Sequence, residues 1–112
     1  MTRIYSEQEV VARVRGLSVP LLLRFIEAEI VRPVSRGKPQ ARGYAKVDVA
    51  RLRLACELAE EFDLDTDALG LVMGLIDRLH ATRADLRALM RAVAAEPEDV
   101  RARIAAAVRR AG

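Results

Sequence analysis

The side chains that most often carry chemistry are few in this sequence and lie far apart. Cys56 is the single cysteine and His80 the single histidine among 112 residues, so neither an internal disulfide nor a metal site of several cysteines can form. Cys56 stands in an apolar stripe at helical spacing, which indicates a small core side chain more than a reactive thiol. We find no nucleophile beside a base, no supported carboxylate pair and no glycine-rich phosphate loop. The sequence therefore predicts a protein that is not an enzyme and has no cofactor or metal.

Charged residues are segregated along the chain. Residues 1–55 carry eleven Lys or Arg against five Asp or Glu, whereas residues 56–80 carry seven acids against Arg78 alone. Residues 81–112 return to an excess of base, and the whole chain has a net charge of +3. A basic first half is expected of a nucleic-acid binder. The acidic middle indicates either a solvated face or a docking site for a basic partner.

The composition favours helices. Apolar residues make up 52% of the sequence but aromatic residues only 4%, so Leu, Val, Ile and Ala must build the core. Runs of alternating β-branched residues are too short to predict ordinary strands. The longest apolar run is too short for a membrane span, and no signal peptide opens the sequence. We therefore expect a mainly all-α, cytoplasmic protein that is not in a membrane.

Two short helices joined by a tight turn are predicted within residues 5–33. Ser6 and Glu9 have the spacing of a capping box at the start of the first helix. Gly16 can adopt the positive φ that a tight turn requires. Ser18 is a good cap for the second helix. Helix, glycine turn and helix form the helix-turn-helix outline, which is a shape and names no function.

A basic loop follows the helix pair. It carries Arg36, Lys38, Arg42 and Lys46 and no acid, and its glycines and proline predict the turns of a short hairpin, or wing. A basic wing beside a helix-turn-helix commonly straddles phosphates. A solvated connector is the alternative.

Three further helices are predicted after the loop. The first runs over residues 49–62 with Asp48 as its cap, a long one runs from its cap Asp65 to about residue 95, and a final one runs over about residues 98–110. The apolar side of the first consists of Val49, Leu52, Cys56, Ala59 and Phe62. The predicted parts are a winged helix-turn-helix domain over 1–64, a long heptad helix over 65–95, and a short helix or tail over 97–112.

The long helix carries apolar residues at heptad spacing. In its first half the apolar arc is wide and includes Leu71, Met73 and Leu75, as expected for packing into the domain core. In its second half the arc narrows to a seam, as expected for pairing with another helix. We predict that this seam forms a homodimer, and a surface helix of a monomer is the alternative. The predicted dimer residues are Leu79, Arg83, Leu86, Met90 and Val93.

The order of these elements resembles the MerR-like winged-helix class over about residues 4–80. The resemblance is carried by Ser18, Leu22, Phe25, Ile30-Val31-Arg32-Pro33, Arg42 with Tyr44, and Arg51-Leu52-Arg53. Within that class the chain is most similar to the short chaperone modulators called CbpM. That similarity lies in Gly16-Leu17-Ser18, the Ile30 to Pro33 exit, the acidic junction LACELAEEFDLD and the helix Leu69 to Leu79. It implies a cytoplasmic protein that binds the J-domain of a CbpA/DnaJ-like co-chaperone and inhibits its work with Hsp70.

The second helix departs from the DNA-binding members of that class. Leu21 and Leu23 stand where those relatives have Thr and Arg, and Arg24 occupies the first aromatic position. Leucine can neither donate to a phosphate nor specify a base, and surplus apolar surface is typical of a protein-docking face. In the alternative, Leu21 packs under the first helix and Leu23 against the Ile30 turn, which leaves the basic wing and Arg24 for weak DNA contact.

Two functions follow as predictions. In the first, a J-domain binds an acidic patch beside the leucines of the second helix. The predicted partner-binding residues are Leu21, Leu23, Arg24, Glu57, Glu60, Glu61, Asp63 and Asp67. In the second, a dimeric MerR-family transcriptional regulator binds a pseudo-palindromic DNA site. The predicted DNA contacts are Arg24, Arg36, Lys38, Arg42 and Tyr44.

Overall fold

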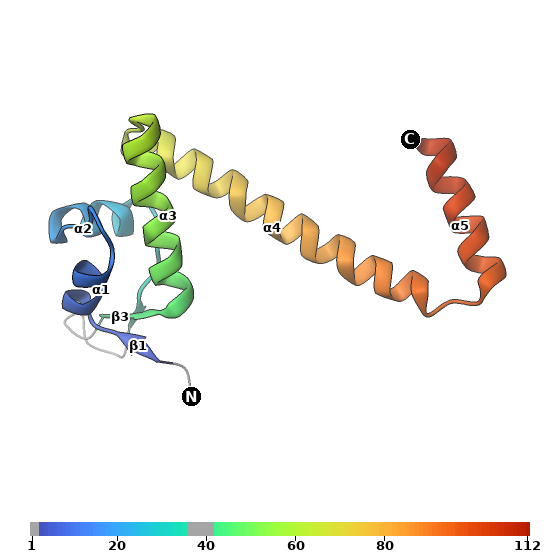
Figure 1. The fold of residues 1–112 in the computed structure, drawn as a ribbon, viewed down its shortest axis with the longest axis horizontal. Helices are drawn as coiled ribbons and strands as arrows, with labels where there is room; N and C mark the ends of the chain where they lie inside the picture. The colour runs from blue at the N-terminus through green and yellow to red at the C-terminus, as the bar shows by residue number, and fades with distance from the viewer. Residues whose placement is uncertain (1–2, 36–41) are drawn as a thin grey trace. The chain divides into compact units, whose positions relative to one another are not determined.

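The computed structural model describes residues 3–35 and 42–112. In these residues the protein is mainly helical, with five helices and three short strands (Figure 1). The elements in chain order are β1 (Ile4–Tyr5), α1 (Glu7–Arg13), α2 (Val19–Glu27), β2 (Val34–Ser35), β3 (Arg42–Ala45), α3 (Lys46–Phe62), α4 (Thr66–Ala94) and α5 (Glu98–Ala111). The chain divides into two compact units, Met1–Leu75 and Ile76–Gly112.

The first two helices have the ends that the sequence predicts. Ser6 Oγ accepts a hydrogen bond from the Glu9 N–H at 3.1 Å, and the Glu9 carboxylate accepts one from the Ser6 N–H at 3.2 Å, which completes the capping box. Gly16 has a φ of +85° in the turn, where glycine avoids the steric penalty of a side chain. Ser18 Oγ accepts from the Leu21 N–H at 3.3 Å and caps α2.

A small antiparallel sheet belongs to the first unit, with the strand order β1-β3-β2. Val34 pairs with Gly43 in the predicted hairpin, and Ile4 pairs with Ala45. A Cβ atom on Gly43 would collide with the Ile4 side chain, so glycine permits the close approach of β1. Strand β1 was not predicted, because two residues are too few to show a periodicity.

The core of the first unit is built from α1, α2, β3, α3 and the first turns of α4. The largest side chains with almost no exposure are Tyr44, Phe25, Leu22, Ile30, Leu52, Leu69, Met73, Val10, Val14 and Val31. Arg51 Nε donates to the carbonyl oxygen of Ile30, which connects α3 to the segment after α2. Cys56 is buried, as predicted.

Helix α3 differs from its prediction at both ends. It begins at Lys46 after the cap residue Ala45, and the carboxylate of Asp48 accepts the Ala45 N–H at 2.8 Å from inside the first turn. The prediction that Asp48 precedes the helix was therefore wrong. Phe62 was predicted on the apolar side but is 60% exposed, because the core covers this side of α3 only as far as Cys56 and, in part, Ala59.

Helix α4 starts as predicted, since Asp65 Oδ1 accepts the Ala68 N–H at 2.8 Å. Its first turns bury Leu69 and Met73, but Leu71 and Leu75 are 67% and 54% exposed. The predicted wide packing arc was therefore wrong for these two leucines, because a core on one side covers only one stripe of a helix.

The last helix, α5, is present where a short helix or tail was predicted. Val100 and Ile104 on its apolar stripe are half-buried, whereas Val108 is exposed. None of the helices that the structure describes is long and apolar enough to cross a membrane.

Candidate docking surfaces

The exposed side of α2 is less apolar than predicted. Leu21 is half-buried, Leu22 and Phe25 are buried, and Leu23 is 41% exposed beside the exposed Arg24. The interpretation in which Leu21 and Leu23 both pack inward is therefore wrong for Leu23. One partly exposed leucine beside an arginine remains available to a partner.

Three of the predicted acids gather on α3. Glu57, Glu60 and Glu61 are exposed and line a hollow of about 300 Å³; we call these three residues the acidic surface. Asp63 follows as the C-cap of α3, with a φ of +51° that short polar side chains tolerate. None of the three glutamates forms an ion pair with a residue that the structure describes. Their charges are therefore available to a partner.

The remaining predicted partner residues lie at a second hollow. Arg24 and Asp67, together with Glu27 and Thr66, line a hollow of about 340 Å³ between the end of α2 and the start of α4. The two hollows share no lining residue. The sequence grouped all eight partner residues in one site, whereas the structure places them in separate neighbourhoods of the first unit.

Of the predicted DNA-contacting residues, one is buried, one is exposed and three have side chains that the structure does not describe. Tyr44 is completely buried, so the prediction that it contacts DNA was wrong. Strand β3 packs beside α1 and α3, and successive side chains of a strand point to opposite faces, which turns Tyr44 into the core. Arg36, Lys38 and the side chain of Arg42 lie outside the part of the chain that the structure describes. Arg24 is exposed.

The predicted dimer seam is largely exposed on the second half of α4. Leu79, Leu86 and Met90 are 48%, 54% and 61% exposed. Arg83 is also exposed, and Val93 is half-buried. Three large apolar side chains thus have little cover within this chain, which is the condition that a helix-pairing seam requires.

Among the titratable groups that the structure describes, Cys56 is the one buried group with a shifted pKa. Burial raises the pKa of its thiol above the ordinary value, and the negative charges of Glu57 and Glu60 raise it further. We expect the thiol of the native protein to react with a disulfide reagent about tenfold or more slowly than that of the urea-unfolded chain.

The same pKa shift predicts a pH dependence of stability. Because the unfolded chain loses the thiol proton at a lower pH than the folded chain, the free energy of unfolding should fall as the pH rises beyond the ordinary thiol pKa. Urea denaturation at a series of alkaline pH values measures the fall, and Cys56→Ala is the control that should lack it. Equal labelling rates for the native and the unfolded protein would contradict the slower reaction, and an equal fall of stability with pH in Cys56→Ala would contradict the pH dependence.

Comparison with known proteins does not assign the chain to a family. No family model matches the chain, and neither a curated protein nor a solved structure was found to be similar. Within residues 3–35 and 42–112, no group of three or more His, Cys, Asp or Glu side chains could hold a metal ion.

Proposed function

We propose that the protein is a chaperone modulator that binds the J-domain of a CbpA/DnaJ-like co-chaperone and inhibits its work with Hsp70. The proposal includes a MerR-like winged helix-turn-helix domain of the CbpM kind and a homodimer formed by the second half of α4. The observation that carries it is the acidic surface of Glu57, Glu60 and Glu61, which are exposed and form no ion pair with the described residues.

The chemistry of the acidic surface suits the basic helix that a J-domain presents to Hsp70. Opposite charges steer the encounter of two proteins and raise the association rate. Phe62 directly follows Glu61 and is 60% exposed. An exposed aromatic side chain beside charged residues supplies the apolar anchor that tight interfaces need. Leu23 was predicted to have this role, but it lines neither hollow with the acids.

Calorimetric titration of the full chain with a J-domain from the same organism tests the proposal. Changing Glu57, Glu60 and Glu61 to Lys should weaken binding about tenfold or more, because close charge pairs across an interface are worth about 1.5 kcal/mol or more. The matched control changes Asp85, Glu98 and Asp99 to Lys, which alters the net charge equally in the second unit. Unchanged affinity in the first variant, with normal circular dichroism, would contradict the proposal.

A MerR-family DNA-binding regulator is the second candidate. The basic first half of the chain and the exposed Arg24 support it, whereas the loss of Tyr44 as a contact weakens it. Binding of DNA through several phosphates must fall steeply with salt, since counterions are released. A salt-sensitive duplex complex, together with no heat from any J-domain, would favour this function over the first.

A further inference from the structure

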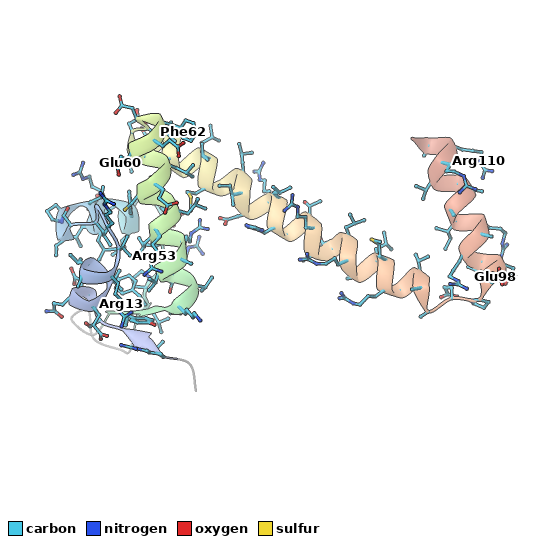
Figure 2. All side chains as sticks on the ribbon, in the orientation of Figure 1. Arg13, Arg53, Glu60, Phe62, Glu98 and Arg110 are labelled. Atoms are coloured by element: carbon cyan, nitrogen blue, oxygen red, sulfur yellow. The ribbon has the colours of Figure 1, made fainter. Side chains whose placement is uncertain are left out.

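A third hollow, also lined by charged side chains, lies between the end of α1 and the middle of α3 and shares Glu57 and Glu60 with the acidic surface. It has a volume of about 420 Å³, and all of its lining side chains are exposed. The lining residues are Arg13, Arg15, Arg53, Glu57 and Glu60. Figure 2 labels Arg53 and Glu60 along α3 and Arg13 at the end of α1. We call this feature the mixed-charge cleft.

Two of its arginines are held in place by contacts that leave their charge available. Arg53 Nη2 donates to the carbonyl oxygen of Arg13 at 3.4 Å, at a helix end where carbonyl groups lack a helical partner. The guanidinium carbon of Arg13 lies 5.1 Å from the centroid of the Tyr5 ring, a cation–π contact. None of the cleft's three arginines forms an ion pair with an acid among the described residues.

The glutamates of the cleft decide which kind of anion it accepts. Several arginines around one hollow are suited to a carboxylate, because the guanidinium group binds its two oxygens together. Glu57 and Glu60 would repel a further negative charge beside the first. Duplex DNA carries one charge per about 1.7 Å of its axis, so a nucleic-acid backbone would meet the glutamates as well as the arginines. A single carboxylate places only one negative charge at the arginines, and a basic group beside it is attracted by the glutamates, which offsets their repulsion of the carboxylate.

We propose that the mixed-charge cleft binds an Asp or Glu side chain of a protein partner, while a basic side chain of the same partner segment lies on the acidic surface. This inference rests on the proposed function for the identity of the partner and deepens it. Recognition then depends on the order of charges along α3, which runs from the positive Arg53 to the negative Glu61. The partner segment must carry both signs of charge in the matching order. A purely basic segment would be repelled by the arginines, which excludes wrong partners and wrong orientations.

Arg15 is the residue to change, because no hydrogen bond, ion pair or ring contact holds it among the described residues. In the full chain, Arg15→Glu should weaken J-domain binding about tenfold or more. Arg103→Glu on α5 makes the same charge change elsewhere and should leave the affinity unchanged. When the exposed acids of the J-domain are changed to Arg one at a time, one of these variants should restore binding to the Arg15→Glu protein. If Arg15→Glu binds like the unchanged protein, the inference is wrong while the proposed function stands.

A second measurement tests the inference without a J-domain. The side-chain N–H signals of the cleft's arginines are followed by NMR as the full chain is titrated with short peptides and a DNA duplex. A peptide with both Lys and Asp should move these signals, and an all-Lys peptide should not. An all-Asp peptide or the duplex binding as strongly as the mixed peptide would overturn the inference, as would no response to any probe. If the mixed peptide binds but no J-domain does, the proposed function fails and the cleft assignment stands.

Discussion

Replacing Phe25 by Ala should lower the free energy of unfolding of the first unit by about 3–5 kcal/mol. Phe25 lies in the middle of α2 and is only 1% exposed. Truncation removes the whole buried aromatic ring and leaves a cavity that neighbouring side chains fill only in part. Domains of this size have a total stability of about 5–15 kcal/mol, so the loss would bring this unit close to unfolding.

Leu23→Ala is the matched control for Phe25→Ala, two residues earlier on the same helix. Leu23 is 41% exposed, so its truncation should cost less than about 1.5 kcal/mol, the lower end for a fully buried leucine. Urea denaturation followed by tyrosine fluorescence reports on this unit, because Tyr5 and Tyr44 both belong to it. A similar loss of stability in the two variants would show that α2 does not bury Phe25 as the structure has it.

Leu86→Asp should dissociate the proposed homodimer. Leu86 is 54% exposed in the single chain and lies between Leu79 and Met90 in the seam. Burying a leucine side chain is worth about 1.5–3 kcal/mol. In a two-fold symmetric dimer each substitution occurs twice. The variant dimer therefore loses the burial of two leucines and must move two carboxylates out of water. Its dissociation constant should rise by about a hundredfold or more.

Analytical ultracentrifugation at several protein concentrations measures the dissociation of Leu86→Asp. Ala84→Asp is the control, because residue 84 is exposed and, at 100° per residue, lies on the opposite side of α4 from the seam. That variant adds the same charge to the same helix and should stay dimeric. A monomeric unchanged protein would contradict the proposed dimer, and a dimeric Leu86→Asp would place the interface elsewhere.

Three of the corrected predictions share a cause. Phe62, Leu71 and Leu75 have apolar side chains at helical spacing, and that spacing indicates a core face whether or not another element covers it. The structure leaves all three exposed. Tyr44 shows the reverse error: an aromatic residue in a basic loop was predicted to contact DNA, but pairing of β3 with β1 and β2 places it in a sheet that packs on the helices.

The mixed-charge cleft was missed for a related reason. Arg13 and Arg53 are forty residues apart, and no periodicity relates residues of α1 to residues of α3. The only signal in the sequence was the change from basic to acidic residues around Cys56. That signal gave the signs of the two charged surfaces without showing that they meet in one cleft.

The sequence by itself determined three of the helix starts and the tight turn of the first unit. The caps at Ser6, Ser18 and Asp65 and the turn at Gly16 depend on hydrogen bonds and backbone angles within three or four residues, so the neighbouring residues are sufficient. Only the tertiary structure decided which side chains are covered and which charges stand together. Burial and the grouping of charges depend on elements that are distant in sequence, and their contacts form only when the chain has folded.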